Sequence, residues 1–221
     1  MSRTLLTLAL SAVVAAGLLA RPSPAEAQTP TGSTRALGMS NAIHSISSGT
    51  MAPYGNPAGM SMVYQYMVEG SYGFVHESND SRAGIAVIDS STNPGFALGG
   101  AYLYQGGAVS GDVDGHWHRL NVGGSTGYQS GSVGVFFGGL YHYQHDALAD
   151  THDGSFGMIV SVQRMINLGV VGHNLFDPRP DPGRRRMLSS GISVGREQFI
   201  LAFDTTVDFS SREEPTMIYA G

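Results

Sequence analysis

The chain has no cysteine among its 221 residues, and only 13% of the residues are charged. The lack of cysteine excludes a disulfide scaffold and thiol chemistry. The net charge is −5 and no basic face is evident, so a nucleic-acid partner is not expected. The one basic run, Arg184 to Arg186, follows a proline-rich loop and is interpreted as solvated loop rather than a phosphate site. Beyond the first 27 residues, no stretch is a candidate transmembrane helix.

The first part of the sequence has the pattern of an export signal. Arg3 supplies a positive start, Leu5 to Ala20 is apolar, and Ala25-Glu26-Ala27 has the small-x-small form of a cleavage site. The apolar run is on the short side for a membrane anchor. We therefore expect residues 1–27 to be a signal peptide, the mature chain to begin near Gln28, and the protein to leave the cytoplasm.

From about residue 61 onward, hydrophobicity alternates with a period of two, which is typical of β-strands. One face of the predicted strands is apolar and aromatic, as at Leu120 and Val122, and the other is polar or glycine, as at Asn121 and Gly123. Short connections near residues 91, 130, 165 and 196 alternate with long ones near 79, 110, 150, 180 and 212. A soluble sandwich also alternates, but its loops need not alternate in length. The pattern predicts an all-β fold, an antiparallel transmembrane β-barrel.

Residues 28–60 do not have the strand pattern. Ala36 to Ser47 can form a short helix, which Gly49 would end, and a series of turns is predicted between Pro53 and Gly59. A compact segment ahead of the first strand is well placed to fold into the mouth of a barrel. We therefore expect three regions: a signal peptide (1–27), an N-terminal plug (28–60) and barrel strands (61–221).

Two motifs in the predicted plug carry a resemblance to a known family. Arg35-Ala36-Leu37-Gly38-Met39 and Asn56-Pro57-Ala58-Gly59 resemble the N-terminal pattern of the FadL-like outer-membrane β-barrel superfamily. That family includes long-chain fatty-acid and hydrocarbon transporters and the PorV-type proteins of type IX secretion. A third stretch, Gly172 to Pro178, is similar to the segment that ends a mid-barrel strand in the PorV-like branch.

The resemblance implies a protein of the cell outer membrane, surrounded by outer-membrane lipid and needing no cofactor. In the transporter branch it implies passive uptake of hydrophobic small molecules such as fatty acids. In the PorV branch it implies a shuttle or scaffold that binds a secreted protein during cell-surface assembly. Asn174 and Leu175 favour the second branch slightly, and the polar, glycine-rich inner face does not demand an apolar ligand. Both functions stay open on the sequence.

Three residues are the candidates for ligand binding or gating. Asn56 is expected to fix the Asn-Pro-Ala-Gly turn through side-chain hydrogen bonds, while Pro57 restricts Asn56 to extended dihedrals. Glu69 is predicted to face inward, as are Asp204 and Asp208. A water-filled barrel interior accounts for inward-facing carboxylates as well as a catalytic role does, and the sequence contains no nucleophile elbow. We therefore do not expect an enzyme.

Histidines gather near the long-connection end of two predicted strands. Pairing through the short turn at Ser130 would bring them together beside an acidic loop. The residues concerned are His116, His118, His142, His145, Asp146, Asp150, His152 and Asp153. Imidazoles and carboxylates are able to bind a divalent metal, but no motif sets a ligand geometry. A polar rim with Trp117, Tyr141 and Tyr143 accounts for the same residues, so no metal site is predicted.

The count of predicted strands is ten, and the last, Thr216 to Gly221, is short and has no terminal aromatic residue. The family that the chain resembles has a larger barrel. A ten-stranded lumen would leave little space for a plug of about thirty residues, because barrel diameter grows with strand number. We therefore expect an incomplete barrel from a truncated reading frame, with a curved open sheet whose first and tenth strands are not paired.

Overall fold

The computed structural model describes residues 39, 42–75, 80–93, 95–106, 108–109, 113–114, 116–146, 150–176, 186–196, 199–209 and 216–220. The predicted signal peptide and residues 28–38 of the predicted plug lie outside these ranges. The described part consists of β-strands and two short 3₁₀-helices, η1 (Gly49–Met51) and η2 (Pro57–Ser61). This confirms the prediction of an all-β fold.

Ten strands form one antiparallel sheet in which each strand pairs with the next along the chain, apart from the insertion of a separate two-stranded β4–β5 sheet. The strands of the large sheet are β1 (Tyr66–Val75), β2 (Asp80–Asn93), β3 (Phe96–Gly106), β6 (Trp117–Ser130), β7 (Val133–Asp146), β8 (Asp150–Val162), β9 (Ile166–His173), β10 (Met187–Arg196), β11 (Phe199–Asp208) and β12 (Thr216–Ala220). The small sheet pairs β4 (Ala108–Val109) with β5 (Val113–Asp114).

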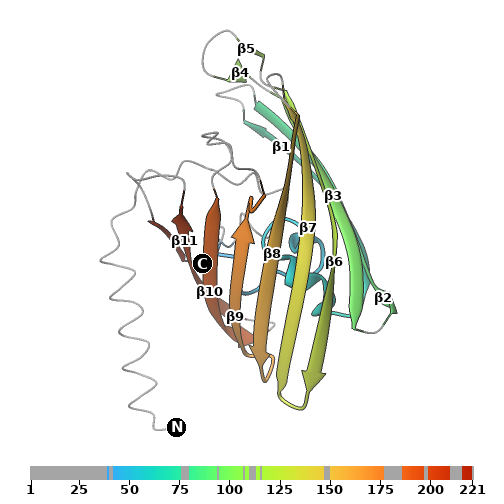
Figure 1. Ribbon diagram of the computed structural model, residues 1–221, viewed down its shortest axis with the longest axis vertical. Coiled ribbons are helices and arrows are strands. Elements are labelled where there is room, and N and C mark those ends of the chain that lie inside the picture. The colour runs from blue at the N-terminus through green and yellow to red at the C-terminus, as the bar shows by residue number, and fades with distance from the viewer. Residues whose placement is uncertain are drawn as a thin grey trace.

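The large sheet curves strongly, and residues 42–62 lie on its concave side (Figure 1). In the order of strands, β1 and β12 are the two edges. Among the described residues β1 pairs only with β2, and β12 only with β11, so these strands do not close a barrel. This agrees with the expected open sheet.

The two faces of the sheet have opposite chemistry. On the convex face, Val122 of β6 and its partner Tyr141 of β7 are each 49% exposed. On the concave face, the neighbouring pair Asn121 and His142 are 3% and 5% exposed. Large apolar side chains are exposed in the same way from β1 to β11. The predicted division of β6 into outward and inward residues is therefore confirmed.

The segment of residues 42–62 differs from its prediction. The predicted helix from Ala36 to Ser47 is not formed over residues 42–47, which make turns. The carbonyl of Ile43 accepts hydrogen bonds from the backbone N–H groups of Ile46 and Ser47 and from the Ser47 hydroxyl, so the turn is closed locally. Gly49 then has a φ of +55°, which turns the chain into η1.

Two strand boundaries also differ from the prediction. β1 begins at Tyr66 rather than near residue 61, because η2 continues the concave segment to Ser61. β7 and β8 continue into the long connection predicted near residue 150, since cross-strand pairing extends to His145 and Asp150. In these extensions His152 is the cross-strand partner of Tyr143 and Asp150 is that of His145, and such pairs stabilise strands.

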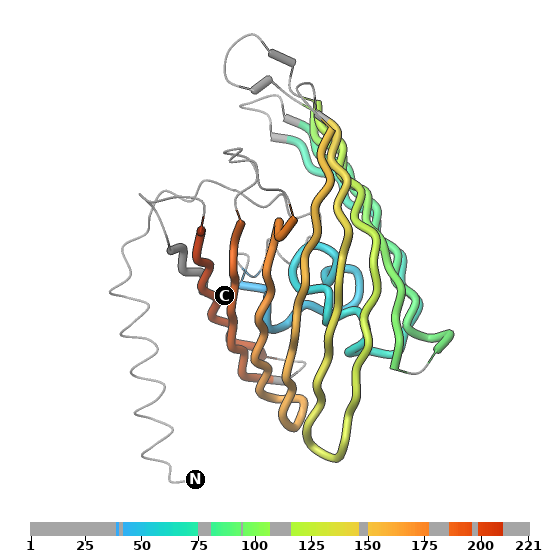
Figure 2. Tube along the Cα trace, in the orientation of Figure 1, coloured from blue at the N-terminus to red at the C-terminus, as the bar shows by residue number. Residues whose placement is uncertain are grey.

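The segment lies within the curve of the sheet (Figure 2), and the buried apolar core is formed by side chains of both. Ile43, Ile46 and Met51 of the segment pack with Ala202 of β11. Met60 packs with sheet residues Ile88, Ala97 and Leu140, and Ala58 packs with Phe136 and Ile159. Each cluster contains residues of both parts, so the segment fills the concave side as a structural core.

Candidate functional site

Asn56 is the centre of the contact between the segment and the sheet, and its side chain is fully buried. Its Nδ2 lies 3.0 Å from the carbonyl oxygen of His44 and 3.2 Å from those of Met158 and Val170. Its Oδ1 accepts a hydrogen bond from the backbone N–H of Ala58, which caps η2. One side chain therefore links the two halves of the segment to β8 and β9.

Pro57 follows Asn56 as the first residue of η2 and is also fully buried. Proline suits this position because the first N–H groups of a helix have no partner within it. Asn56 has extended dihedrals, as predicted for a residue before proline. The two residues together therefore set the direction in which η2 leaves the turn.

The sheet meets the segment through two cross-strand pairs of glycines, which we name the glycine floor: Gly138 of β7 with Gly157 of β8, and Gly169 of β9 with Gly191 of β10. A Cβ on Gly157 would lie 2.0 Å from Oδ1 of Asn56, and one on Gly138 would lie 2.4 Å from the carbonyl carbon of Pro57. A Cβ on Gly169 would lie 2.1 Å from the carbonyl oxygen of His44. The backbone of the segment thus lies directly on the backbone of the sheet.

A buried histidine–aspartate pair fastens the start of the segment to β11. Oδ2 of Asp204 accepts hydrogen bonds from the backbone N–H of His44, at 2.7 Å, and from its Nδ1, at 2.8 Å. Asp204 is 0% exposed. A Cβ on Gly191 would lie 1.9 Å from Oδ1 of Asp204, so the glycine also makes room for this carboxylate.

A chain of hydrogen bonds crosses the concave face beside the segment. Asn121 donates from Nδ2 to the carbonyl of Pro53 at 3.1 Å, so its Oδ1 is the acceptor for Nδ1 of His142 at 2.7 Å. Nε2 of His142 then accepts from the hydroxyl of Ser155 at 2.7 Å, and that hydroxyl oxygen accepts from Nδ1 of His173 at 3.3 Å. The proton positions follow from the direction of the Asn121 amide. The chain satisfies polar groups that burial would otherwise destabilise.

Glu69 lies at the β1 side of the segment and is half-buried. Its Oε2 accepts a hydrogen bond from the hydroxyl of Thr50. Burial, together with the negative charge of Glu69, raises the pKa of Tyr54 to about 12, so this phenol stays protonated at neutral pH. Glu69 therefore contacts the segment at β1, whereas Asn56 and Pro57, which are part of the segment, lie against β7, β8 and β9.

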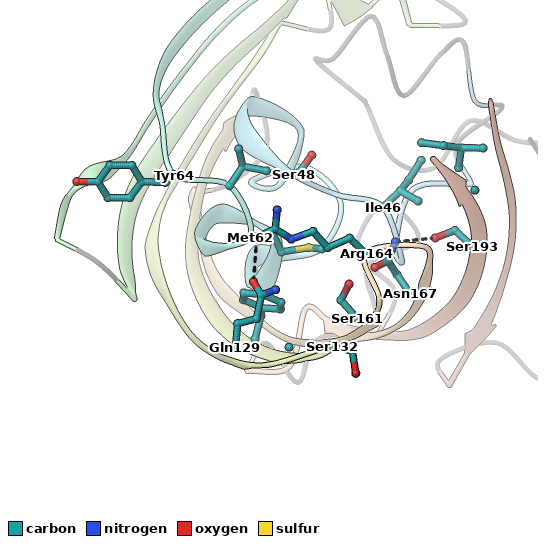
Figure 3. A pocket seen from close by; sticks show the side chains of 15 residues that line it. Ile46, Ser48, Met62, Tyr64, Gln129, Ser132, Ser161, Arg164, Asn167 and Ser193 are labelled. Atoms are coloured by element: carbon teal, nitrogen blue, oxygen red, sulfur yellow. Dashed lines mark hydrogen bonds between the residues drawn. The ribbon is translucent and has the colours of Figure 1, made fainter. Parts of the chain in front are cut away.

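A cavity of about 870 Å³ lies below the segment, at the end of the sheet with the short turns (Figure 3). The segment contributes Ile46, Ser48 and Met62 to its wall. The sheet contributes mixed apolar and polar side chains: Phe136, Ser161, Asn167, Ser193 and Ile200. Near its rim, Nη2 of Arg164 donates to Oε1 of Gln129 at 3.4 Å. The cavity can accept a molecule that has both apolar and hydrogen-bonding groups.

The predicted gathering of histidines occurs, but on two opposite faces. His142 is buried on the concave face, whereas His116, His145 and His152 are exposed on or beside the convex face. Asp153 is buried, and its Oδ1 accepts from the backbone N–H groups of Gly154 and Phe176. The described part of the chain has no cluster of three or more side chains able to hold a metal ion.

His44, Asp204 as its partner, and the glycine floor were not identified as a site from the sequence. A signal for the floor exists, since Gly138, Gly157, Gly169 and Gly191 all fall on the polar face of their strands. Asp204 was predicted to face inward, but its partner lies 160 residues away along the chain. No local pattern joins two such distant positions.

Comparisons with known proteins give no assignment: no protein-family model, no curated protein and no solved structure matches the chain. Within the residues that the structure covers, no helix has the length and apolar character needed to span a membrane. A functional interpretation therefore depends on the geometry of the two faces and on the residues at the segment.

Proposed function

We propose that this chain is an outer-membrane β-barrel protein of the FadL-like type that carries hydrophobic small molecules across the outer membrane, with residues 42–62 as its plug. The observation that carries the proposal is the inverted arrangement of the sheet. Apolar side chains cover its exposed convex face, and polar side chains, glycine and the segment fill its concave face. A transmembrane barrel needs this arrangement, because lipid surrounds it and polar groups must be satisfied inside.

The cavity beside the segment supports a ligand-binding role. It has apolar walls at Ile46, Phe136 and Ile200 and hydrogen-bonding groups at Asn167 and Ser193. In a closed barrel of the proposed kind, a molecule that crosses the concave side would meet the segment, which is packed against β6, β7 and β8. Transport therefore requires the segment to shift, and Asn56 and Glu69 are the residues whose contacts would have to change.

The location is tested by cell fractionation. The mature protein is expected to separate with the outer membrane and to need detergent for extraction, because so much apolar surface is exposed on the convex face. The measurement is an immunoblot of separated inner-membrane, outer-membrane and periplasmic fractions. Recovery of a soluble periplasmic monomer would contradict the proposal.

The plug role is tested by conductance in planar bilayers. Replacing both Asn56 and Pro57 by alanine removes the hydrogen bonds to β8 and β9 and frees the turn, so passive flux of small solutes is expected to rise. Asn93→Ala, at an exposed strand end, is the matched control and should leave conductance unchanged. Equal conductance of the double variant and the parent chain would argue against gating by the segment.

A second candidate function is a shuttle or scaffold for a secreted protein. The observation that favours it is the density of buried bonds around Asn56 and His44, which suits a permanent core better than a moving gate. Co-purification separates the two functions. Lipid-like small molecules in the detergent extract support transport, whereas a secreted protein in equal amount supports the scaffold.

A further inference from the structure

Eight outward-facing aromatic side chains form a belt at the long-connection end of the sheet. We name them the tyrosine–histidine belt: Tyr102, Tyr104, His116, His118, Tyr141, Tyr143, His145 and His152. Tyr104, His118 and His145 are cross-strand neighbours in one row over β3, β6 and β7. In the next row, Tyr143 of β7 is the neighbour of His152 of β8. Below these rows the convex face is apolar, as at Val122 and Val87.

The same hydrogen bond occurs three times within the belt. The hydroxyl of Tyr102 lies 2.5 Å from Nδ1 of His118, and that of Tyr104 lies 3.0 Å from Nδ1 of His116. The hydroxyl of Tyr141 makes the third such bond, to Nδ1 of His152. With the phenol as donor, each neutral imidazole carries its proton on Nε2. Three Nε2–H groups are then left to donate to a molecule outside the sheet.

On the strands of the belt, β3, β6, β7 and β8, no lysine or outward-facing arginine competes with the histidines as a hydrogen-bond donor. The chain contains no lysine. Arg119 of β6 is on the concave face, where its Nε donates to Oδ1 of Asn121. The carboxylate of Asp150 lies 2.5 Å from Nδ1 of His145, so this negative charge is paired with the fourth histidine. The belt therefore presents hydrogen-bond donors, and its one carboxylate is hydrogen-bonded to a histidine within the belt.

We propose that the tyrosine–histidine belt binds the phosphate group of a lipid headgroup. This inference rests on the proposed membrane location, which places the belt where the apolar face meets the headgroups, at the end with the longer loops. Phosphate oxygens are strong acceptors, and imidazole N–H groups make charge-assisted hydrogen bonds to them. The rings of His116 and His118 have their centroids 6.0 and 5.1 Å from that of Tyr104, so these two donors are close enough to reach the oxygens of one headgroup, whereas His152, two strands away on β8, would meet another.

Lipid titration of the purified protein in detergent micelles tests the proposal. The probes are dihexanoyl phosphatidic acid and dihexanoylglycerol, which have the same acyl chains with and without phosphate. The single tryptophan, Trp117, lies between His116 and His118 and reports binding by its fluorescence. The parent chain is expected to bind the phosphorylated lipid about tenfold more tightly than the lipid without phosphate, as lost charge-assisted bonds would predict.

The variant His116→Phe, His118→Phe, His152→Phe keeps the aromatic surface and removes the Nε2–H donors. It is expected to lose the preference for the phosphorylated lipid. Tyr102→Phe, Tyr104→Phe, Tyr141→Phe keeps the histidines, frees their tautomers and is expected to reduce the preference in part. Tyr66→Phe with Tyr128→Phe, both exposed outside the belt, is the matched control and should keep it.

The possible outcomes separate this inference from the proposed function. If the parent chain needs detergent but binds the two lipids equally, the proposal of phosphate binding by the belt is wrong, while the proposed membrane location stands. Equal preference in the parent chain and in the histidine variant has the same consequence, once circular dichroism shows both to be folded. If the chain stays monomeric and soluble without detergent, both the membrane location and the phosphate binding by the belt are wrong.

Discussion

Gly138→Ala is expected to destabilise the protein by about 3 kcal/mol or more, because overpacking against fixed backbone atoms is costly. Its Cβ would lie 2.4 Å from the carbonyl carbon of Pro57 and 2.6 Å from the backbone nitrogen of Ala58, neither of which is a flexible side-chain end. The segment would have to lift from the sheet to admit one methyl group. Urea unfolding in detergent micelles, followed by Trp117 fluorescence, measures the change.

Gly139→Ala provides a matched control at the next position of the same strand. It points to the convex face, where the nearest atoms to its Cβ lie 3.8 Å away, so stability should change by less than about 0.5 kcal/mol. Gly157→Ala should behave like Gly138→Ala, since the two glycines are cross-strand partners under the same turn. The two losses should not add, because both come from lifting the same segment. Equal unfolding midpoints for Gly138→Ala and Gly139→Ala would contradict the close contact of segment and sheet.

Asn56→Asp is expected to be as damaging as any single substitution in the chain, with a loss of about 3–5 kcal/mol. The change keeps the shape but turns the amide NH₂ into a carboxylate oxygen that faces the carbonyls of His44, Met158 and Val170. The carboxylate oxygen and the three carbonyl oxygens are then all acceptors at a fully buried site, and the introduced negative charge has no partner there. Asn56→Ala should cost less, because it leaves carbonyls unsatisfied but adds no charge.

The pH dependence of Asn56→Asp identifies the cause. Burial beside carbonyl oxygens raises the pKa of the introduced carboxyl in the folded state, and a protonated carboxyl can donate a hydrogen bond. The folded state then binds more protons than the unfolded state, so the variant should gain stability as pH falls. Asn93→Asp, at an exposed strand end, is the control and should stay close to the parent chain. A loss from Asn56→Asp that is the same at acidic and neutral pH would contradict the introduced charge as its cause.

Much of the sheet could be predicted from period-two alternation. The assignment of Val122 outward and Asn121 inward follows from strand geometry alone, because successive side chains must point to opposite faces. The antiparallel order follows as well, since short connections leave no room for a crossover. Asn56 and Pro57 were identified because their turn chemistry is local.

Two features of the fold differ from the sequence-based predictions, because each depends on a contact between distant residues or neighbouring strands. The helix predicted over residues 36–47 fails at 42–47, where the Ile43 carbonyl and the Ser47 hydroxyl close a single turn that is buried against β11. The long connection predicted near residue 150 is shorter than expected, because the pairing of His145 with Asp150 extends both β7 and β8. In both cases a tertiary or cross-strand contact outweighs the propensity of the residues.

The sequence by itself determined the class of the fold, the two faces of the sheet and the turn at Asn56, because each depends on residues close together in the chain. Only the tertiary structure decided what the concave face holds. The pair of His44 with Asp204 joins positions 160 residues apart, and the glycine floor has meaning only because the segment lies on it. Alternation shows that a glycine faces inward, but the curvature of the whole sheet decides which backbone comes within 2.4 Å of Gly138.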